Sequence, residues 1–343
     1  MKLDDFDFVL PARLIAQKPA PERDSSKMMV VRRHEGRIEH RRFRELPEIL
    51  NPEHFLVINN TRVFPARLRA SRAGKDEGIE VLLLRELRPR AWLALVKPAR
   101  KAPLGQKLKM GDLTAQVVDV HETGSRVFQF EPGTDLPEAF ERIGEPPTPP
   151  YIHRHKGQEL AEDRIRYQTI YARHSGSVAA PTAGLHFTGE VLRNLRTRGI
   201  PVCELLLHVG YGTFQPVRCD NVEEHRMEPE YYELDEANAG RILSYKSEGR
   251  RLIAVGTTTT RCLEFLARDA ALSASSGFCN LFIYPGFEFK MLDGLLTNFH
   301  LPRSTLFMLV CAFAGRERML DCYREAISNN YRFYSYGDCM LVL

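Results

Sequence analysis

The chain has 343 residues, of which 43% are hydrophobic and 27% are charged, as in an ordinary soluble globular protein. A chain of this length can bury a substantial core, and we expect one or two domains. The net charge of +4 is too small to identify a nucleic-acid-binding protein by itself. The seven cysteines include no Cys-x-x-Cys pair, which argues against a zinc knuckle or a redox pair.

The N-terminal sequence and the apolar runs of the chain predict its cellular compartment. The first residues, MKLDDFDF, lack the basic-then-apolar pattern of a secretory signal. No apolar run reaches the length of a membrane-spanning helix. We therefore expect a cytoplasmic, reduced protein that makes no membrane contact.

Charge is distributed unevenly along the chain. Residues 32–44 contain six Arg and two Glu, and residues 66–110 contain twelve Lys and Arg against four Asp and Glu. Residues 111–150 reverse the balance, with two basic residues against eight acidic ones. A phosphate backbone would prefer the two basic stretches, although a solvated basic face explains the same pattern.

The first 150 residues predict strands of two kinds. A turn-rich lead precedes predicted strands at 28–32 and 55–59. Residues 67–150 then offer short β-type runs between Gly, Pro and charged turns, at 79–84, 91–96, 113–120 and 127–130. Short strands at regular spacing predict a small β-barrel or sandwich. The Pro-rich segment EPPTPPY at 145–151 predicts a domain boundary.

After residue 151, strands and helices alternate. Thr188 and Gly199 bracket a predicted helix as its N-cap and C-cap, and Asp235 and Ser304 are the predicted N-caps of two more. Further predicted helices are 260–268 and one that runs through 326, and the predicted strands are 202–209, 251–255, 281–284 and 340–343. This alternation predicts a layered α/β main domain formed by residues 1–66 and 151–343. Residues 67–150 are then an inserted, small β-barrel-like domain.

Four segments run from apolar residues into Gly, Thr, Asn or His. They are AAPTAGLHF (179–187), LHVGYGTFQPV (207–217), VGTTTTR (255–261) and TNFHLPRSTL (297–306). Ligands of an α/β sheet bind beyond the carboxyl ends of its strands, so such segments predict a site. None contains a metal-ligating cluster or a pair of carboxylates. The implied site is polar and largely uncharged, which suits a nucleobase and a ribose better than a metal.

Each of these segments also has a simpler interpretation. Gly256 and the threonines after it predict a helix N-terminus that favours a carboxylate or phosphate, or merely a capped turn. His208 could be a general base or a buried histidine bonded to a carbonyl group. Because His186, His208 and His300 all lie on such segments, we predict that the three converge on one pocket.

Two other segments are candidates for nucleic-acid contacts. FLVINNTRVF places two asparagines, a threonine and Arg62 at a strand end, where amides read base edges and arginine meets phosphate or carboxylate. A capped turn with a surface arginine is the alternative. YRFYSYGD (331–338) is aromatic and basic, as in platforms on which bases stack, but such a stretch also suits core packing.

Taken together, these segments resemble one family closely, the S-adenosylmethionine:tRNA ribosyltransferase-isomerases of queuosine synthesis. The matching segments cover nearly the full length in order, and they also include PPYI, YQTIYA, EEHRMEPEYY and LFIYPGFEFK. The chain departs from the family pattern at Lys27, Met28 and Met29, and at Glu228, where many members have His.

The resemblance implies a specific reaction. The ribosyl part of S-adenosylmethionine moves onto the aminomethyl group of a 7-deazaguanine in a tRNA with a GUN anticodon. The sugar rearranges to an epoxycyclopentane, adenine and methionine leave, and the product is epoxyqueuosine. S-adenosylmethionine is then a substrate, and we expect neither a prosthetic group nor a metal. We also expect a monomer.

The chemistry assigns roles to residue types. A sulfonium acidifies the neighbouring C5′ hydrogens, so a histidine can start the reaction as a base, and a carboxylate can balance the sulfonium charge. Hydroxyl and amide groups can bind adenine or ribose, and the methionine carboxylate can lie at 256–258 or against Arg62. The predicted catalytic residues are His186, His208, His225, His300, Asp5 and Glu230. The predicted substrate-binding residues are Asn59, Asn60, Thr61, Arg62, Thr182, Gly184, Gly210, Gly212, Thr213, Gly256, Thr257, Thr258, Arg261, Asn298, Tyr331, Arg332 and Phe333.

Two other functional classes remain open from the residues alone. An S-adenosylmethionine-dependent RNA methyltransferase would need a glycine-rich loop after its first strand and a downstream acid, and neither is evident. A non-catalytic RNA-binding module would need basic and aromatic surface more than polar strand ends. Release of adenine with methionine, of S-adenosylhomocysteine, or of neither product distinguishes the three classes.

Overall fold

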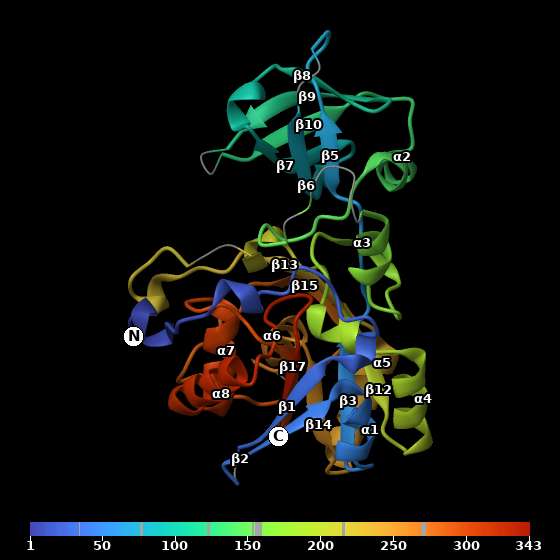
Figure 1. Ribbon diagram of the computed structural model, residues 1–343. Helices are drawn as coiled ribbons and strands as arrows, with labels where there is room; N and C mark the ends of the chain where they lie inside the picture. Colours follow the sequence, from blue (N-terminus) through green and yellow to red (C-terminus); the bar gives the residue numbers. More distant parts are fainter. Residues whose placement is uncertain are drawn as a thin grey trace.

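The computed structural model describes all residues except 34, 76–77, 122–123, 153, 155–159, 215–216 and 269–271. The described residues form a large mixed α/β body and a smaller antiparallel body at one end of it (Figure 1). The predicted fold class, an α/β main body with a β-barrel-like addition, is confirmed.

A large mixed sheet is the framework of the α/β body. Its nine strands among the described residues are, in spatial order, β15 (Ser275–Cys279), β13 (Glu230–Leu234), β12 (Val202–Leu207), β3 (His54–Asn59), β14 (Arg251–Val255), β16 (Gly294–Asn298), β17 (Cys339–Val342), β1 (Lys27–Arg32) and β2 (Arg37–Arg42). The neighbours β12, β3, β14 and β16 are parallel to one another. Their carboxyl ends therefore meet at one edge of the sheet, where ligands bind in open α/β folds.

The central strands are buried on both faces, which explains their continuous apolar sequences. In β3, Phe55 and Val57 pack into one hydrophobic core, whereas Leu56 and Ile58 pack into another on the opposite face. Successive side chains of a strand point to opposite faces, so a run without polar residues needs cover on both sides.

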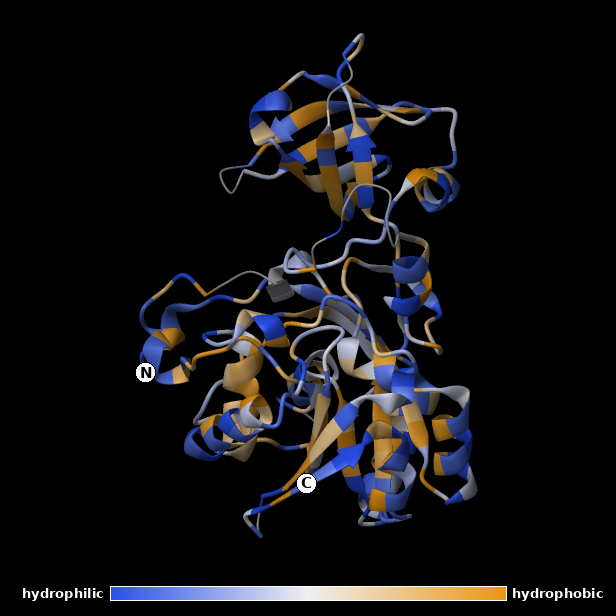
Figure 2. Cartoon of the chain, viewed as in Figure 1, coloured by the Kyte–Doolittle hydropathy of each residue, from blue (hydrophilic) through white to orange (hydrophobic). Residues whose placement is uncertain are grey.

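Helices supply that cover. One face carries α5 (Glu236–Ser247), α6 (Thr257–Leu266), α7 (Thr305–Ala314) and α8 (Arg316–Ser328), and the other carries α1 (Leu46–Ile49) and α4 (Gly189–Thr197). Hydrophilic residues colour much of α4 and α8, which border solvent (Figure 2). The predicted N-caps Thr188, Asp235 and Ser304 are confirmed, because each side chain accepts a backbone N–H of its helix.

Short elements connect this framework. The 3₁₀ helices are η1 (Leu3–Phe6), η2 (Ala12–Leu14), η3 (Arg23–Ser25), η4 (Phe43–Glu45), η5 (Ala99–Lys101), η6 (Thr182–His186), η7 (Tyr211–Phe214) and η8 (Val222–Glu224). A two-stranded parallel ribbon joins β4 (Thr61–Val63) to β11 (His174–Ser177), and α3 (Leu160–Arg166) lies between the two bodies in Figure 1.

The smaller body is an antiparallel sheet that curls into a nearly closed barrel. Among the described residues its six strands are, in spatial order, β5 (Arg67–Ala70), β6 (Ile79–Arg88), β7 (Ala91–Lys97), β10 (Arg126–Phe130), β9 (Leu113–Val120) and β8 (Lys107–Met110). Ser71 and Lys109 exchange two backbone hydrogen bonds of 2.9 Å, which connect the two ends of the sheet. This body has its own hydrophobic core, which also contains α2 (Leu136–Ile143). Phe64, Ala66 and Val178 also belong to this core, and the predicted boundaries at 66/67 and 150/151 stay a prediction.

Three details of the predicted elements are wrong. Residues 281–284 are not a strand; the strand lies earlier, at β15, and Leu281 gives its carbonyl to the Arg261 side chain. The helix predicted at 260–268 begins at Thr257, because Gly256 adopts φ +96° and ends β14 in a tight turn. The segment 179–187 contains η6 rather than a strand of the large sheet.

Candidate active site

A cavity of about 560 Å³ lies beyond the carboxyl ends of β14 and β16. Its walls come from the start of α6, the loop after β16, the segment 180–183, and residues near 151 and 334. The volume is within the usual range for sites that enclose a small molecule. The edge of the sheet that the sequence predicted therefore carries a cavity large enough for a nucleoside joined to an amino acid.

The N-terminus of α6 forms one wall. Thr259 and Thr260 donate their hydroxyls back to the carbonyls of Val255 (2.7 Å) and Gly256 (3.1 Å). Among the described residues, the hydroxyls of Thr257 and Thr258 have no hydrogen-bond partner, and both residues line the cavity. The first backbone N–H groups of a helix also lack partners within it, and they carry its positive dipole end. This wall can therefore bind an anionic group such as a carboxylate.

His300 enters the cavity from the loop after β16. Its Nε2 lies 2.8 Å from the hydroxyl of Thr297, and its backbone N–H donates to the hydroxyl of Tyr323 at 3.0 Å. Burial lowers the pKa of His300 to about 3. The imidazole is therefore neutral near pH 7, and a neutral imidazole can accept a proton.

An aromatic wall lies opposite, at Tyr151 and Tyr334, whose ring centroids are 4.1 Å apart. Tyr334 has a backbone φ of +73°, a conformation that residues other than glycine rarely adopt. Its carbonyl accepts the Asn298 amide at 2.9 Å, and its N–H donates to Phe299 at 3.0 Å. The strand end at Asn298 thus fixes an unfavourable turn that brings an aromatic ring to the cavity.

Buried charges support the cavity wall from behind. Glu230 and Arg261 form an ion pair of 2.7 Å, and each is less than 5% exposed. Glu230 also accepts the Gly210 N–H at 2.8 Å and the Thr213 hydroxyl at 3.2 Å. Thr213 lines the cavity, whereas neither charged residue does. The pair therefore holds the loop 210–213 in place.

Comparison with known proteins identifies the family. The model of a family described as queuosine biosynthesis protein matches residues 3–342. The chain is 49% identical over 346 residues to the S-adenosylmethionine:tRNA ribosyltransferase-isomerase of Desulfitobacterium hafniense and 50% identical over 347 residues to that of Moorella thermoacetica, each covering 100% of both chains. The chain belongs to this family. It is a tRNA-modifying transferase-isomerase of queuosine synthesis, which confirms the predicted enzyme class and excludes the methyltransferase and the passive binding module.

A solved structure of the family extends over the same length. The crystal structure of S-adenosylmethionine tRNA ribosyltransferase from Thermotoga maritima is 38% identical. It matches with a TM-score of 0.57 and covers 99% of this chain and 100% of its own. The mixed α/β architecture is therefore shared with an enzyme of the same family.

In this member of the family, seven of the predicted site residues line the cavity. They are Thr182, Thr213, Gly256, Thr257, Thr258, Asn298 and His300. Sequence reasoning missed Tyr151, Arg303, Tyr334 and Ser335, which also line it. The segments PPYI, HLPRSTL and YRFYSYGD carried a usable signal, but which of their side chains reach the cavity depends on the turns between them.

Asn59, Asn60, Thr61 and His208, at the ends of β3 and β12, do not line the cavity, although Thr213 in the loop after β12 does. His208 Nδ1 lies 2.8 Å from the hydroxyl of Thr61, and its ring packs on Gly176, where an added Cβ would lie 2.5 Å from Nε2. Burial lowers the pKa of His208 to about 4. Asn59 bonds both backbone groups of Leu207, at 2.8 and 3.1 Å, and the Thr61 N–H at 3.1 Å. These side chains bind one another and the neighbouring strand.

Other predicted residues make their contacts away from the cavity, on the surface or in the core. Asn60 donates to Glu204 at 3.0 Å, and Arg62 pairs with Glu141 at 3.3 Å on the surface. Asp5 accepts the Lys2 N–H at 2.8 Å. The His225 ring contacts Phe282. The remaining residues outside the cavity lining are His186, Gly184, Gly210, Gly212, Arg261, Glu230, Tyr331, Arg332 and Phe333.

The packing of three of these residues explains why they do not line the cavity. Tyr331 and Phe333 are at most 1% exposed and pack within the hydrophobic core beside β17. Gly184 lies against the Tyr171 hydroxyl, where an added Cβ would come within 2.2 Å. The aromatic segment 331–338 thus supplies core packing through two of its rings and a cavity wall through another.

The described residues contain neither a cluster of metal ligands nor a membrane-spanning helix. Within them, no group of three or more His, Cys, Asp or Glu side chains is arranged to hold a metal ion. No helix in the same residues is long and apolar enough to cross a membrane.

Proposed function

We propose that this cavity binds S-adenosylmethionine and that ribosyl transfer to the 7-aminomethyl-7-deazaguanine of a tRNA begins there. One observation carries the proposal: a cavity of about 560 Å³, lined by apolar and polar side chains, combines an open helix N-terminus with a neutral histidine. The names of the relatives, which specify S-adenosylmethionine and tRNA, support the same substrates.

The α6 wall is the proposed site of the methionine end. The carboxylate would accept hydrogen bonds from the free N–H groups at the start of α6 and from the hydroxyls of Thr257 and Thr258. Asn298, Thr182 and Thr213 would then bind the ribose and adenine through neutral hydrogen bonds. The rings of Tyr151 and Tyr334 are tilted by 43° to each other, and either one offers an apolar face on which a base can stack.

His300 is the proposed base, because it alone of the four candidate histidines lines the cavity among the described residues. The sulfonium acidifies the hydrogens on C5′, and the neutral imidazole takes one of them, which leaves a carbanion stabilised as a sulfonium ylide. Thr297 can fix the orientation of the ring through its bond to Nε2. Later steps join the rearranged sugar to the RNA amine and release adenine and methionine.

The proposal extends to the partners and the setting of the reaction. The RNA substrate is a tRNA with a GUN anticodon, S-adenosylmethionine is consumed as a substrate, and no prosthetic group takes part. The enzyme acts as a cytoplasmic monomer. The two basic stretches, 32–44 and 66–110, support a role of the surface in holding the RNA.

Hydrogen exchange at C5′ tests the role of the cavity. The enzyme is incubated with S-adenosylmethionine in deuterated water, and the recovered compound is analysed for deuterium at C5′. We expect exchange with the wild type and none with H300Q. With 7-aminomethyl-7-deazaguanine tRNA present, the wild type should release adenine and methionine. Unchanged exchange in H300Q would contradict the assignment of the base.

A further inference from the structure

A second, smaller cleft opens next to the cavity. It has a volume of about 20 Å³ and is lined by Arg23, Arg166 and His186 together with the loop 19–26 and the turn 335–337. Ser335 lines both this cleft and the main cavity, so the two sites share a wall. The space admits one water molecule or one oxygen of a larger group whose remaining atoms stay outside.

Two half-buried arginines meet in this cleft without a carboxylate. Arg23 donates to the carbonyls of Leu185 (3.1 Å) and Ile165 (2.8 Å). Arg166 donates to those of Pro21 (3.1 Å) and Ala20 (2.6 Å). Within the part of the chain that the structure describes, neither guanidinium forms an ion pair. Burial, and then the neighbouring Arg166, lower the pKa of Arg23, so an anion between the two would relieve an unfavourable arrangement.

The same cleft contains buried nitrogen atoms that no described group satisfies. Arg166 Nε and His186 Nε2 are buried and lack hydrogen-bond partners among the described residues. His186 is only 4% exposed, and burial lowers its pKa to about 4, partly offset by the Asn298 side chain. His186 therefore lies between the cleft and a residue of the main cavity. Buried polar groups without a partner usually mark the place of a ligand or an ordered water.

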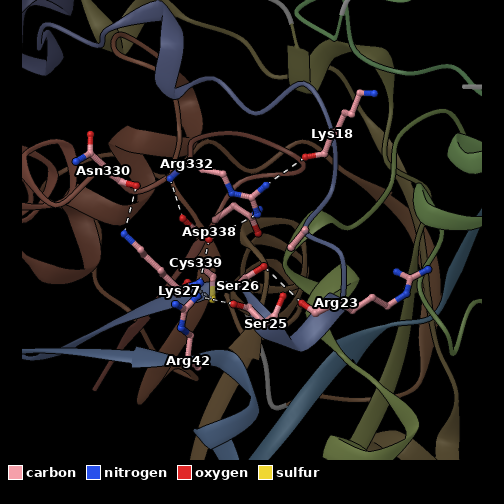
Figure 3. A network of polar contacts seen from close by, with 12 residues as sticks. Lys18, Arg23, Ser25, Ser26, Lys27, Arg42, Asn330, Arg332, Asp338 and Cys339 are labelled. Carbon is pink, nitrogen blue, oxygen red and sulfur yellow. Dashed lines mark hydrogen bonds and ion pairs between the residues drawn. The ribbon is translucent and has the colours of Figure 1, made fainter. Parts of the chain in front are cut away.

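Charged groups of both signs surround the cleft. Figure 3 shows Arg23, Lys18 and Arg332 around a network whose central carboxylate is Asp338. Asp338 accepts the backbone N–H groups of Lys27 at 2.9 Å and Arg332 at 2.8 Å. These two N–H groups and the Arg332 guanidinium, 3.7 Å from the carboxylate, bind the Asp338 charge inside the network.

We propose that this arginine cleft binds a backbone phosphate of the tRNA, next to the nucleotide that enters the main cavity. The inference rests on the proposed function. A guanidinium has five N–H donors, of which the carbonyls use two on each arginine; the remaining donors can bind a phosphate, one oxygen of which fits the narrow part of the cleft. Phosphate contacts position a nucleic acid without reading its sequence. A phosphate held at the wall shared through Ser335 would align the neighbouring base with the cavity.

A double-mutant cycle between protein and RNA tests the proposal. The RNA is an anticodon-arm hairpin in which single phosphates near the target nucleotide are replaced by uncharged methylphosphonates. The proteins are the wild type, R166Q and the charge-retaining R166K, with R196Q as a matched control on the exposed face of α4. Binding of the hairpin is measured in the absence of S-adenosylmethionine, as a function of salt.

We expect R166Q to weaken hairpin binding about tenfold and to reduce the salt slope by about 0.7, the value for one phosphate of a single strand. R166K should recover part of the loss, and R196Q should match the wild type. One methylphosphonate should weaken binding to the wild type but hardly change binding to R166Q. S-adenosylmethionine binding by each variant shows that it is folded.

Two outcomes would overturn the proposal. If every methylphosphonate weakens binding equally to the wild type and R166Q, the cleft holds water. If inorganic phosphate binds in an Arg166-dependent way while the RNA shows no coupling, the cleft is a site for a free anion. Failure of the proposed function would show separately, as absence of adenine release or of S-adenosylmethionine binding by the wild type.

Discussion

The carboxyl edge of the large sheet contains two pairs of strand ends that look alike in sequence and differ in the structure. After β14 and β16 the chain exposes Thr257, Thr258 and His300 to a cavity. After β3 and β12 it carries Asn59 and His208, which are bonded to neighbouring backbone and to Thr61. Polar residues at a strand end therefore become available to a ligand only where the fold leaves them without internal partners.

The connections after each strand explain the difference. β14 leads through Gly256 directly into α6, so the first groups of a helix N-terminus face outward. β3 instead continues into β4, which pairs with β11 and covers the strand ends. His208 then packs on Gly176 of β11, and Asn59 joins β3 to β12. The ends of β14 and β16 form the main binding edge. The ends of β3 and β12 are bonded to each other and to the β4–β11 ribbon, and the chain after β12 reaches the cavity at Val209, Thr213 and Val217.

The largest expected effect separates the two histidines. H300Q should lower kcat about 10²–10⁴-fold if His300 moves the C5′ proton, because a positioned base contributes that much. H208Q should leave kcat close to the wild-type value, since His208 contacts Thr61 and Gly176 rather than the cavity. Adenine release at saturating substrates measures both. A large loss in H208Q with normal stability would place the chemistry at the other pair of ends.

The next effect concerns stability. Asn59→Ala removes the partner of both backbone groups of Leu207 and of the Thr61 N–H, so it should lower the free energy of unfolding by about 2–4 kcal/mol. The KM for S-adenosylmethionine should stay unchanged. Asn298→Ala should show the reverse pattern, a raised KM with a smaller loss of stability. Urea titration and steady-state kinetics measure the two quantities.

Protonation offers a third comparison. Burial lowers the pKa of His186 to about 4, of His208 to about 4 and of His300 to about 3. Each unfolded histidine titrates near pH 6.5, so the unfolded chain binds more protons between these values. The free energy of unfolding is therefore highest above pH 6.5. It decreases as the pH falls toward 4, by up to about 1.4 kcal/mol per pH unit for each histidine.

Substitution of one histidine isolates its share of that dependence. The unfolding free energy of H208Q, measured from pH 7 down to pH 5, should fall less steeply than that of the wild type, by up to about 1.4 kcal/mol per pH unit. H121Q, at an exposed position in the barrel, serves as the control. Equal slopes in the wild type and H208Q would show that His208 is not held neutral by burial.

The smallest effect tests the helix N-terminus. Thr258→Val removes one hydroxyl from the cavity wall and should raise the KM for S-adenosylmethionine by roughly tenfold or less, the range for one hydrogen bond to a charged group. Thr260→Val removes a hydroxyl that bonds the Gly256 carbonyl, so it should affect stability but not the KM. Similar KM changes in both variants would mean that the methionine end lies elsewhere.

Much of the fold could be predicted because local patterns and burial agree. The apolar runs at 55–59 and 251–255 were predicted correctly as strands, and Thr188, Asp235 and Ser304 were predicted correctly as N-caps. The sequence did not predict β13, whose Glu230 pairs with Arg261 from another element. A strand with a buried charge breaks the apolar pattern, and its partner lies 31 residues away.

The sequence by itself determined the family, the enzyme class, the two kinds of sheet and the set of strand ends that had to be considered for the site. Only the tertiary structure decided which of those ends open onto a cavity, because that depends on what the next element of the chain covers. It also decided that Tyr334 forms a wall while Tyr331 and Phe333 fill the core, and that Arg23 and Arg166 meet without a carboxylate. Residue types specify which chemistry is possible, whereas the availability of a polar group depends on contacts between segments that are far apart in the chain.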